Sequence, residues 1–187
     1  PPFFFLMIRR PQRSKPKPSS AASDVFKRQE LCHAVGLKHP HERGLLMQPR
    51  FPGLQRWSNE YRDKGIYDQN AHPFTQLSYV DKGARNGYVP QMIEDFGFLK
   101  SLGALDIAAL QWLYGVNIDH ATGSNVYRLP IENKECTGWK AIWDAGGRDR
   151  IDGSRAKTSV TIDLRNATLD QSEYAGGYIS SVEGVFG

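Results

Sequence analysis

Two kinds of hydrophobic pattern divide the chain near residue 115. Residues 102–114, "LGALDIAALQWLY", are apolar almost all round a helix, which predicts a buried helix that stops at Gly115. Beyond it, short β-type runs separated by turn residues are typical of an all-β module. These runs are "NVYRL" (125–129), "WKAIWD" (139–144), "SVTIDL" (159–164) and "GYISSVEGVFG" (177–187).

Residues 40–73 show neither period. They are rich in Gly, Pro, Asn and charged side chains, which predicts a long irregular loop of the kind that often shapes access to a site. Within this loop, residues 54–65 are compatible with a turn of helix.

Residues 1–29 differ from the rest in composition. A short apolar patch precedes a Pro, Ser, Lys and Arg run without helical or strand period, so we expect this head to be unstructured. It is not a signal peptide, because its charges follow the apolar patch. The strings "FFFLMIRRP" and "SSAASDVFKRQ" resemble translated sequencing-adapter DNA. We therefore hypothesise that native sequence resumes at Glu30; the alternative is a genuine disordered tail with a basic stripe.

The head also carries the excess positive charge. Residues 1–29 contain seven Lys and Arg against one acidic residue, which leaves 17 basic and 19 acidic residues in 30–187. The net charge of +4 therefore does not indicate a nucleic-acid or membrane partner, and no apolar run is long enough to span a bilayer. The two cysteines, Cys32 and Cys136, are far apart, and the sequence alone does not establish a disulfide between them.

The stretch "ELCHAVGLKHPHE" contains the candidate metal-binding residues. On a helix, residues four apart share a face, so the pattern H-E-x-x-H places two imidazoles around one metal with the glutamate beside them. Here Glu30 and His33 keep that spacing, Gly36 falls where the helix must end, and His39 can return to the metal. Gln29 occupies the place of the first histidine. The alternative is a solvated helix followed by a His-rich loop, in which His41 and Glu42 are ordinary loop residues.

With the glycine and the second histidine, this stretch resembles the longer pattern H-E-x-x-H-x-x-G-x-x-H of the metzincins. Further segments resemble the serralysins, secreted bacterial zinc endopeptidases of that clan. "FTQLSYVD" (74–81) is similar to their Met-turn, and "LGALDIAALQWLYG" to the helix that closes their catalytic domain. "TGSNVYRL" and "IWDAGGRDRID" resemble the opening of their calcium-binding β-roll, so the resemblance covers 30–187 in the family's order.

The resemblance implies roles for individual residues. His33 and His39 would bind zinc, and Glu30 would be the general base that takes a proton from the zinc-activated water and passes it to the leaving amine. Tyr79 would bind zinc at rest and then stabilise the oxyanion; without the resemblance it reads as a buried aromatic. Leu77 replaces the Met-turn methionine with an apolar residue of similar size. Gln29 replaces the first zinc ligand, which should greatly weaken metal binding.

Calcium binding is also implied. Carboxylates and carbonyls are the ligands that Ca²⁺ prefers, although from composition alone an Asp- and Gly-rich turn is more often merely a turn. The resemblance predicts one site, with Gly147 in a less secure second one. The residues of the first site are Ala121, Gly123, Asn125, Asp144, Gly146 and Asp149.

These observations predict an α+β fold. Residues 30–115 would be the C-terminal part of a metzincin catalytic domain, and 116–187 the start of a parallel β-roll whose glycine-rich repeats lie beyond Gly187. We expect the parent to be a secreted, monomeric, zinc-dependent and calcium-stabilised endopeptidase that acts on proteins or peptides, without nucleic acid or membrane insertion. The chain itself would be an internal fragment without proteolytic activity.

Two alternatives belong to other functional classes. If Gln29 is native, the chain could be a degenerate protease that has kept a calcium-dependent binding or adhesion role. The other alternative is a structural β-roll segment of a larger surface protein, in which the remnant of the zinc helix is incidental.

Overall fold

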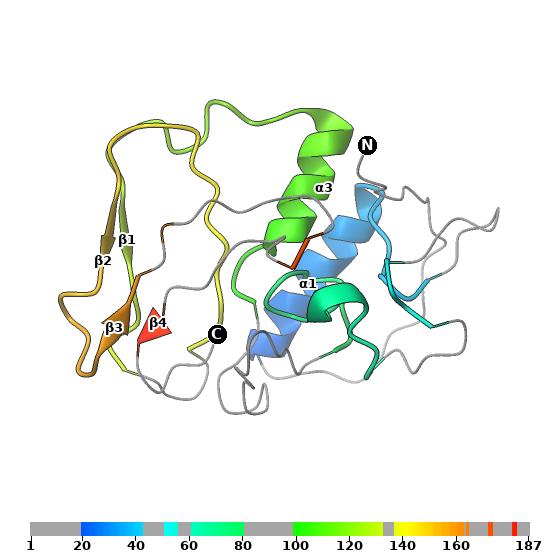
Figure 1. Cartoon of the computed structure of the whole chain (residues 1–187). Helices are drawn as coiled ribbons and strands as arrows, with labels where there is room; N and C mark the ends of the chain where they lie inside the picture. Colours follow the sequence, from blue (N-terminus) through cyan, green and yellow to red (C-terminus); the bar gives the residue numbers. More distant parts are fainter. Residues whose placement is uncertain are drawn as a thin grey trace.

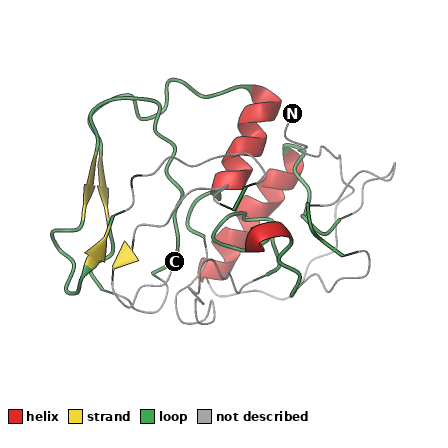
Figure 2. Ribbon diagram, in the orientation of Figure 1, coloured by secondary structure: helices red, strands yellow, loops and turns green. Residues whose placement is uncertain are grey.

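The computed structural model describes residues 20–42, 51–55, 61–80, 99–132, 137–162, 164, 172–173 and 181–182. In this part of the chain, helices and short strands occupy different sides of the molecule, a mixed α and β architecture (Figures 1 and 2). The helical side holds α1 (Ser20–Ala34), the 3-10 helix η1 (Ile66–Asp68) and α3 (Ala104–Tyr114). The other side holds β1 (Val126–Arg128), β2 (Arg150–Asp152), β3 (Val160–Thr161) and β4 (Ser181–Val182).

The hydrophobic core lies between α1, α3 and the loop of residues 69–80. Among the described residues, two clusters of buried side chains form it, and the half-buried leucines of α3 pack against both. Their buried members are Cys32, Leu37, Leu77 and Ala109 in the first cluster, and Ala71, Phe74 and Val80 in the second. The core therefore joins the end of the predicted zinc helix to the predicted Met-turn.

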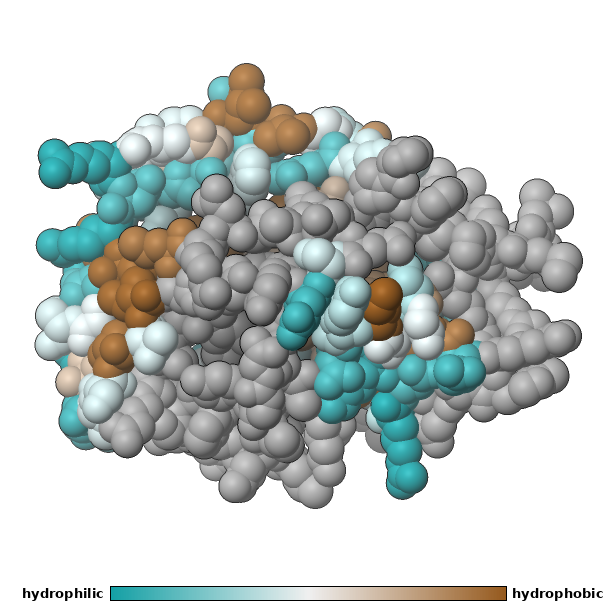
Figure 3. Space-filling model, in the orientation of Figure 1, coloured by the Kyte–Doolittle hydropathy of each residue, from teal (hydrophilic) through white to brown (hydrophobic). Residues whose placement is uncertain are grey.

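Helix α3 confirms the helix predicted over 102–114, but it is not buried all round. Asp106, Ala108 and Ala109 are buried, whereas the side chains of Trp112 and Tyr114 are 54% and 68% exposed. Hydrophobic residues also lie along the upper edge of the molecule in Figure 3, the edge where the segment leaving α3 runs in Figure 1. In the part of the chain that was described, no helix is long and apolar enough to cross a membrane.

Helix α1 corrects the expectation that the whole head is unstructured. The helix begins at Ser20, so residues 20–29 are helical, while residues 1–19 lie outside the described residues. Ala, Lys, Arg and Gln have high helix propensities, which outweighed the missing hydrophobic period. The side chain of Arg28 donates to the side-chain oxygen of Gln76 and to the carbonyl of Leu99, and so ties this helix to the rest of the molecule.

The strands form two pairs. β1 pairs in parallel with β2 in the register Val126 to Arg150, and β3 pairs antiparallel with β4. Strands were predicted around β1, β3 and β4. Strand β2, in contrast, lies in the segment that was assigned to the calcium turn.

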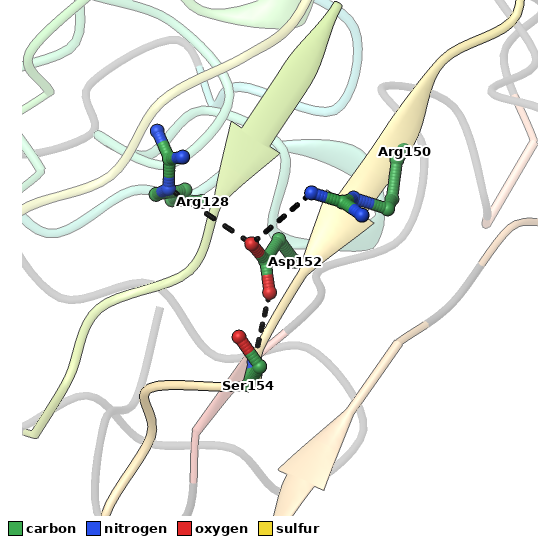
Figure 4. Close-up of polar contacts among 4 residues, drawn as sticks. All are labelled: Arg128, Arg150, Asp152 and Ser154. Atoms are coloured by element: carbon green, nitrogen blue, oxygen red, sulfur yellow. Dashed lines mark hydrogen bonds and ion pairs between the residues drawn. The ribbon is translucent and has the colours of Figure 1, made fainter.

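A charged cluster lies across the β1–β2 pair (Figure 4). Arg128 Nε and Arg150 Nη2 lie 3.9 and 3.6 Å from Asp152 Oδ2, and the Ser154 N–H donates to Asp152 Oδ1 at 3.0 Å. The hydrogen bonds from Ser154, and then the positive charges of the two arginines, hold the pKa of Asp152 below its ordinary value. The cluster therefore favours the observed register, although its exposed arginines limit its contribution to stability.

The prediction of a strand over 139–144 is wrong. Residues 139–144 form an isolated bridge between Trp139 and Leu99 and otherwise have no regular structure. Their backbone is instead held by the segment that precedes α3, because the Lys100 N–H donates to the Trp139 carbonyl and the Ala141 N–H to the hydroxyl of Ser101. The turn of helix considered for 54–65 is absent at the described residues 54–55 and 61–65, and η1 begins just after them.

Candidate functional site

The end of α1 brings His33 and His39 together. Gly36 has a φ of 95°, in the left-handed region that favours glycine. The Gly36 N–H donates to the carbonyl of His33 at 3.0 Å, and the Leu37 N–H donates to that of Cys32 at 2.9 Å. This pair of bonds is the Schellman motif that ends many helices. It reverses the chain, so that His39, only 2% exposed, returns to the ring of His33.

Backbone carbonyls orient both imidazole rings. His33 Nδ1 lies 2.8 Å from the carbonyl oxygen of Leu37, and His39 Nδ1 lies 2.7 Å from that of Leu77. Because a carbonyl oxygen can only accept, each Nδ1 carries a proton and donates it. The Nε2 atom of each neutral ring is then an unprotonated acceptor, which is the form of histidine that binds metals.

The two Nε2 atoms face each other at 3.0 Å. Two lone pairs at this distance repel each other unless a positive centre, a proton or a metal ion, lies close to both. Two nitrogens bound to one tetrahedral zinc at about 2.0–2.1 Å would be about 3.3 Å apart. The spacing and the chemistry of the pair therefore fit zinc.

A third polar atom lies at the same place. The Tyr79 hydroxyl is 3.1 Å from His39 Nε2 and can donate to it. Within the described ranges, no group of three or more His, Cys, Asp and Glu side chains is placed to hold a metal ion. The histidine pair and the phenol thus form a site with fewer imidazoles than the predicted pattern requires.

The other two predicted residues of this helix occupy different positions. Gln29 is half-buried and lies one turn before His33, on the same face of α1. The side chain of Glu30 is exposed, and the contacts that join His33, His39 and Tyr79 do not include it.

Leu77 supports the site with both its backbone and its side chain. Its carbonyl orients His39, while its side chain is 3% exposed and packs in the cluster with Cys32 and Ala109. The Leu77 N–H donates to the hydroxyl of Thr75 at 3.1 Å, which holds the turn. A leucine side chain therefore packs in the core at the position where the resemblance predicted methionine.

Asp106 fixes this turn to α3, and the sequence analysis missed it. Its carboxylate, 3% exposed, accepts from the Thr75 hydroxyl at 2.6 Å, from the Gln76 N–H at 2.7 Å and from the Gly103 N–H at 2.9 Å. Burial raises the pKa of Asp106 to about 6, although the three hydrogen bonds lower it. A sequence signal existed, because Gly103 and Asp106 have the spacing of an N-cap and the third helical residue of a capping box.

Cys32 belongs to the core rather than to the site. Burial, and then the charge of Asp106, raise the pKa of this cysteine to about 12, so it remains a neutral thiol. Cys32 is free and buried, and Cys136 lies outside the described residues.

The residues predicted to bind calcium lie in the two loops that precede β1 and β2. The side-chain NH₂ of Asn125 donates to the carbonyls of Ala121 and Gly123 at 3.0 and 2.9 Å, and it lies 3.5 Å from Asp144 Oδ2. The Asn125 N–H donates to Asp149 Oδ1 at 2.9 Å. Oxygen atoms from two separate loops therefore surround one donor group.

Gly147 allows these loops to approach each other. The Gly146 N–H donates to Asp144 Oδ1 at 3.0 Å, and a Cβ on Gly147 would lie 2.1 Å from the Gly123 carbonyl oxygen. Tyr127 donates to Asp144, and this hydrogen bond is the main cause that lowers the pKa of the aspartate. These carbonyl and carboxylate oxygens are suitable ligands for a hard cation, but the side-chain NH₂ of Asn125 lies among them.

The sequence of the chain is similar to those of several serralysins. The chain is 28% identical over 167 residues to serralysin B of Dickeya chrysanthemi, a match that covers 83% of this chain and 31% of that protein. It is 30% identical over 149 residues to serralysin G of the same organism, covering 75% of this chain and 28% of that protein. A serralysin of Proteus mirabilis is 28% identical over 145 residues, 73% of this chain and 26% of that protein.

No protein-family model matches the chain. The chain spans roughly a third or less of the length of these three curated relatives.

Proposed function

Because the chain belongs with the serralysin-type metalloproteases, we propose that it carries part of the catalytic site of a zinc-dependent endopeptidase. His33 and His39 would hold the metal. The observation that carries the proposal is the pair of Nε2 atoms that face each other at 3.0 Å while both Nδ1 atoms lie within hydrogen-bonding distance of backbone carbonyl oxygens.

Each residue of the site has a role in peptide hydrolysis. Bound zinc would make a water molecule more acidic and polarise the carbonyl of the peptide bond. The exposed carboxylate of Glu30 would accept a proton from the attacking water and transfer it to the leaving amine. The hydroxyl of Tyr79, which lies within hydrogen-bonding distance of His39 Nε2, would contribute to the metal site at rest and would then donate to the oxygen on which negative charge develops.

Gln29 sets the limit on this activity. A catalytic zinc normally has three protein ligands, and an amide side chain is a much weaker zinc ligand than an imidazole. We therefore propose that the chain as written binds zinc weakly and does not cleave proteins, and that a histidine at this position completes the site.

We also propose that the loops around Asn125 bind calcium. Carbonyl and carboxylate oxygens from Ala121, Gly123, Asp144 and Asp149 already converge there, and the amide of Asn125 would move aside for the ion. The parent protein would be secreted, would act on protein or peptide substrates, and would continue from β4 into a calcium-binding β-roll.

Zinc titration of the metal-free chain tests the proposal directly. In isothermal titration calorimetry we expect one zinc to bind, and replacement of either His33 or His39 by alanine to weaken binding by at least tenfold. His120→Ala is the matched control, because this exposed histidine lies in the loops of the other site. Circular dichroism verifies that each variant is folded.

Two results would contradict the zinc proposal. One is a native chain that binds no zinc. The other is zinc binding that survives both the His33→Ala and the His39→Ala substitution, since the metal would then lie elsewhere.

A further inference from the structure

The ring of Tyr79 is packed against three other rings. His39 and His41 contact it at centroid distances of 4.4 and 4.8 Å, with interplanar angles of 50° and 40°. Tyr61 stacks on it almost in parallel, at 5.5 Å and 13°. Tyr61 and Tyr79 are 18 positions apart in the sequence and come from different parts of the loop that precedes α3, so their stacking depends on how that loop is folded.

The backbone next to Tyr61 is firmly held. Asp63 accepts through Oδ2 from the Gln55 N–H at 2.9 Å and through Oδ1 from the Gly65 N–H at 3.0 Å. The side-chain amide of Asn70 donates to the Asp63 carbonyl at 2.6 Å. The segment 61–65 is thus hydrogen-bonded to residues 51–55 and also to Asn70, near the start of the loop that carries Tyr79.

Close backbone packing strengthens this attachment. The Ile66 N–H donates to the carbonyl of Pro52 at 2.8 Å. A Cβ on Gly53 would lie 2.4 Å from the Ile66 nitrogen, and one on Gly65 would lie 2.8 Å from the Pro52 carbonyl oxygen. Only glycine fits at these two contacts, so Tyr61 extends from a rigid turn.

The backbone around Tyr79 is held as well. The His72 N–H donates to the Val80 carbonyl at 3.1 Å, and the Val80 N–H donates to the hydroxyl of Ser78 at 2.9 Å. The phenol ring can therefore move away from His39 only by rotating about its own side-chain bonds. Such a rotation must separate it from the ring of Tyr61.

We propose that Tyr61 is a positioning residue for Tyr79. Its ring supports the Tyr79 ring so that the hydroxyl stays beside His39 Nε2, and it sets how readily the phenol leaves the metal position. This inference rests on the proposed function, in which the phenol contributes to the metal site. Tyr61 is 55% exposed, so its outer side remains open to solvent and to a substrate.

Zinc affinity measured by chelator competition tests this role. Stacked aromatic pairs contribute enough for Tyr61→Ala to weaken zinc binding by about two- to tenfold, whereas Tyr61→Phe, which keeps the ring, leaves it unchanged. In a Tyr79→Phe background the hydroxyl is missing, so Tyr61→Ala should have no further effect on zinc affinity. A merely structural role for Tyr61 would weaken zinc binding equally in both backgrounds and would overturn the proposal.

A measurement on the metal-free chain separates this inference from the zinc proposal. Nuclear Overhauser effects between the ring protons of Tyr79 and His39 should be present in the native chain and in Tyr61→Phe, and they should weaken in Tyr61→Ala. Tyr67→Ala, at an exposed tyrosine on the same loop, is the control and should leave them intact. If no variant binds zinc, the proposed function fails. The inference is then decided by this measurement, and unchanged Overhauser effects in Tyr61→Ala overturn it.

Discussion

The buried carboxylate of Asp106 should make the stability of the chain depend on pH in an unusual direction. Burial raises its pKa from 3.8 to about 6, while most carboxylates in folded proteins are shifted downward or little. The informative change is Asp106→Asn, which removes the titration. The asparagine oxygen can still accept from the N–H groups of Gln76 and Gly103, and its NH₂ can donate to the hydroxyl of Thr75.

The sign and the size follow from linkage. Because the pKa is higher in the folded state, the folded chain holds this proton more tightly than the unfolded chain. The resulting contribution to stability is complete below pH 3.8 and is lost as the pH rises through about 6. A difference of about two pKa units, at about 1.4 kcal/mol per unit, corresponds to about 3 kcal/mol.

Urea unfolding followed by tryptophan fluorescence at a series of pH values measures this effect. The difference in unfolding free energy between Asp106→Asn and the native chain should change by about 3 kcal/mol from pH 3.5 to pH 7, in favour of the variant as the pH rises. A flat difference for Asp106→Asn, or one of opposite sign, would refute the claim that a buried carboxylate tethers the turn to α3.

Three further changes test other parts of the structure. Gly103→Ala would place a Cβ 2.2 Å from the carbonyl oxygen of Phe74, so we expect the free energy of unfolding measured in urea to fall by about 2–3 kcal/mol. Gly123→Ala is the control, because a Cβ there would meet nothing within 4 Å, and equal losses in the two variants would contradict the argument. Gln29→His should raise zinc affinity at least tenfold in chelator competition, whereas Lys27→His on the exposed side of α1 should not; an unchanged affinity would show that this position does not face the metal. Asp144→Asn should abolish the rise in melting temperature on addition of calcium, and a full rise in the variant would place the ion elsewhere.

The sequence predicted those features that depend on local patterns. The apolar run before Gly115 predicted the helix α3 and its end, although the expected burial all round the helix was wrong. The spacing of His33, Gly36 and His39 predicted the helix end and the return of the second ring. Both features involve residues close together in the chain, so the period and the position of a glycine were sufficient.

Features that depend on distant partners were missed. The strand expected at 139–144 did not form because its backbone is held by Ser101 and Lys100 instead of a neighbouring strand. The role of Asp106 was missed because two of its partners, Thr75 and Gln76, lie some 30 positions earlier in the chain. The gathering of the loops around Asn125 came from the family resemblance, because the residue types alone describe an ordinary turn.

The leucine at the predicted Met-turn position has a consequence for resistance to oxidants. The carbonyl of Leu77, which any residue type would supply, orients His39, while the side chain of Leu77 packs in the core cluster with Cys32 and Ala109. Methionine in such a place can be converted to its sulfoxide, which inserts a polar, larger group into an apolar contact. Leucine undergoes no such conversion, so peroxide does not change the side chain at this position of the core.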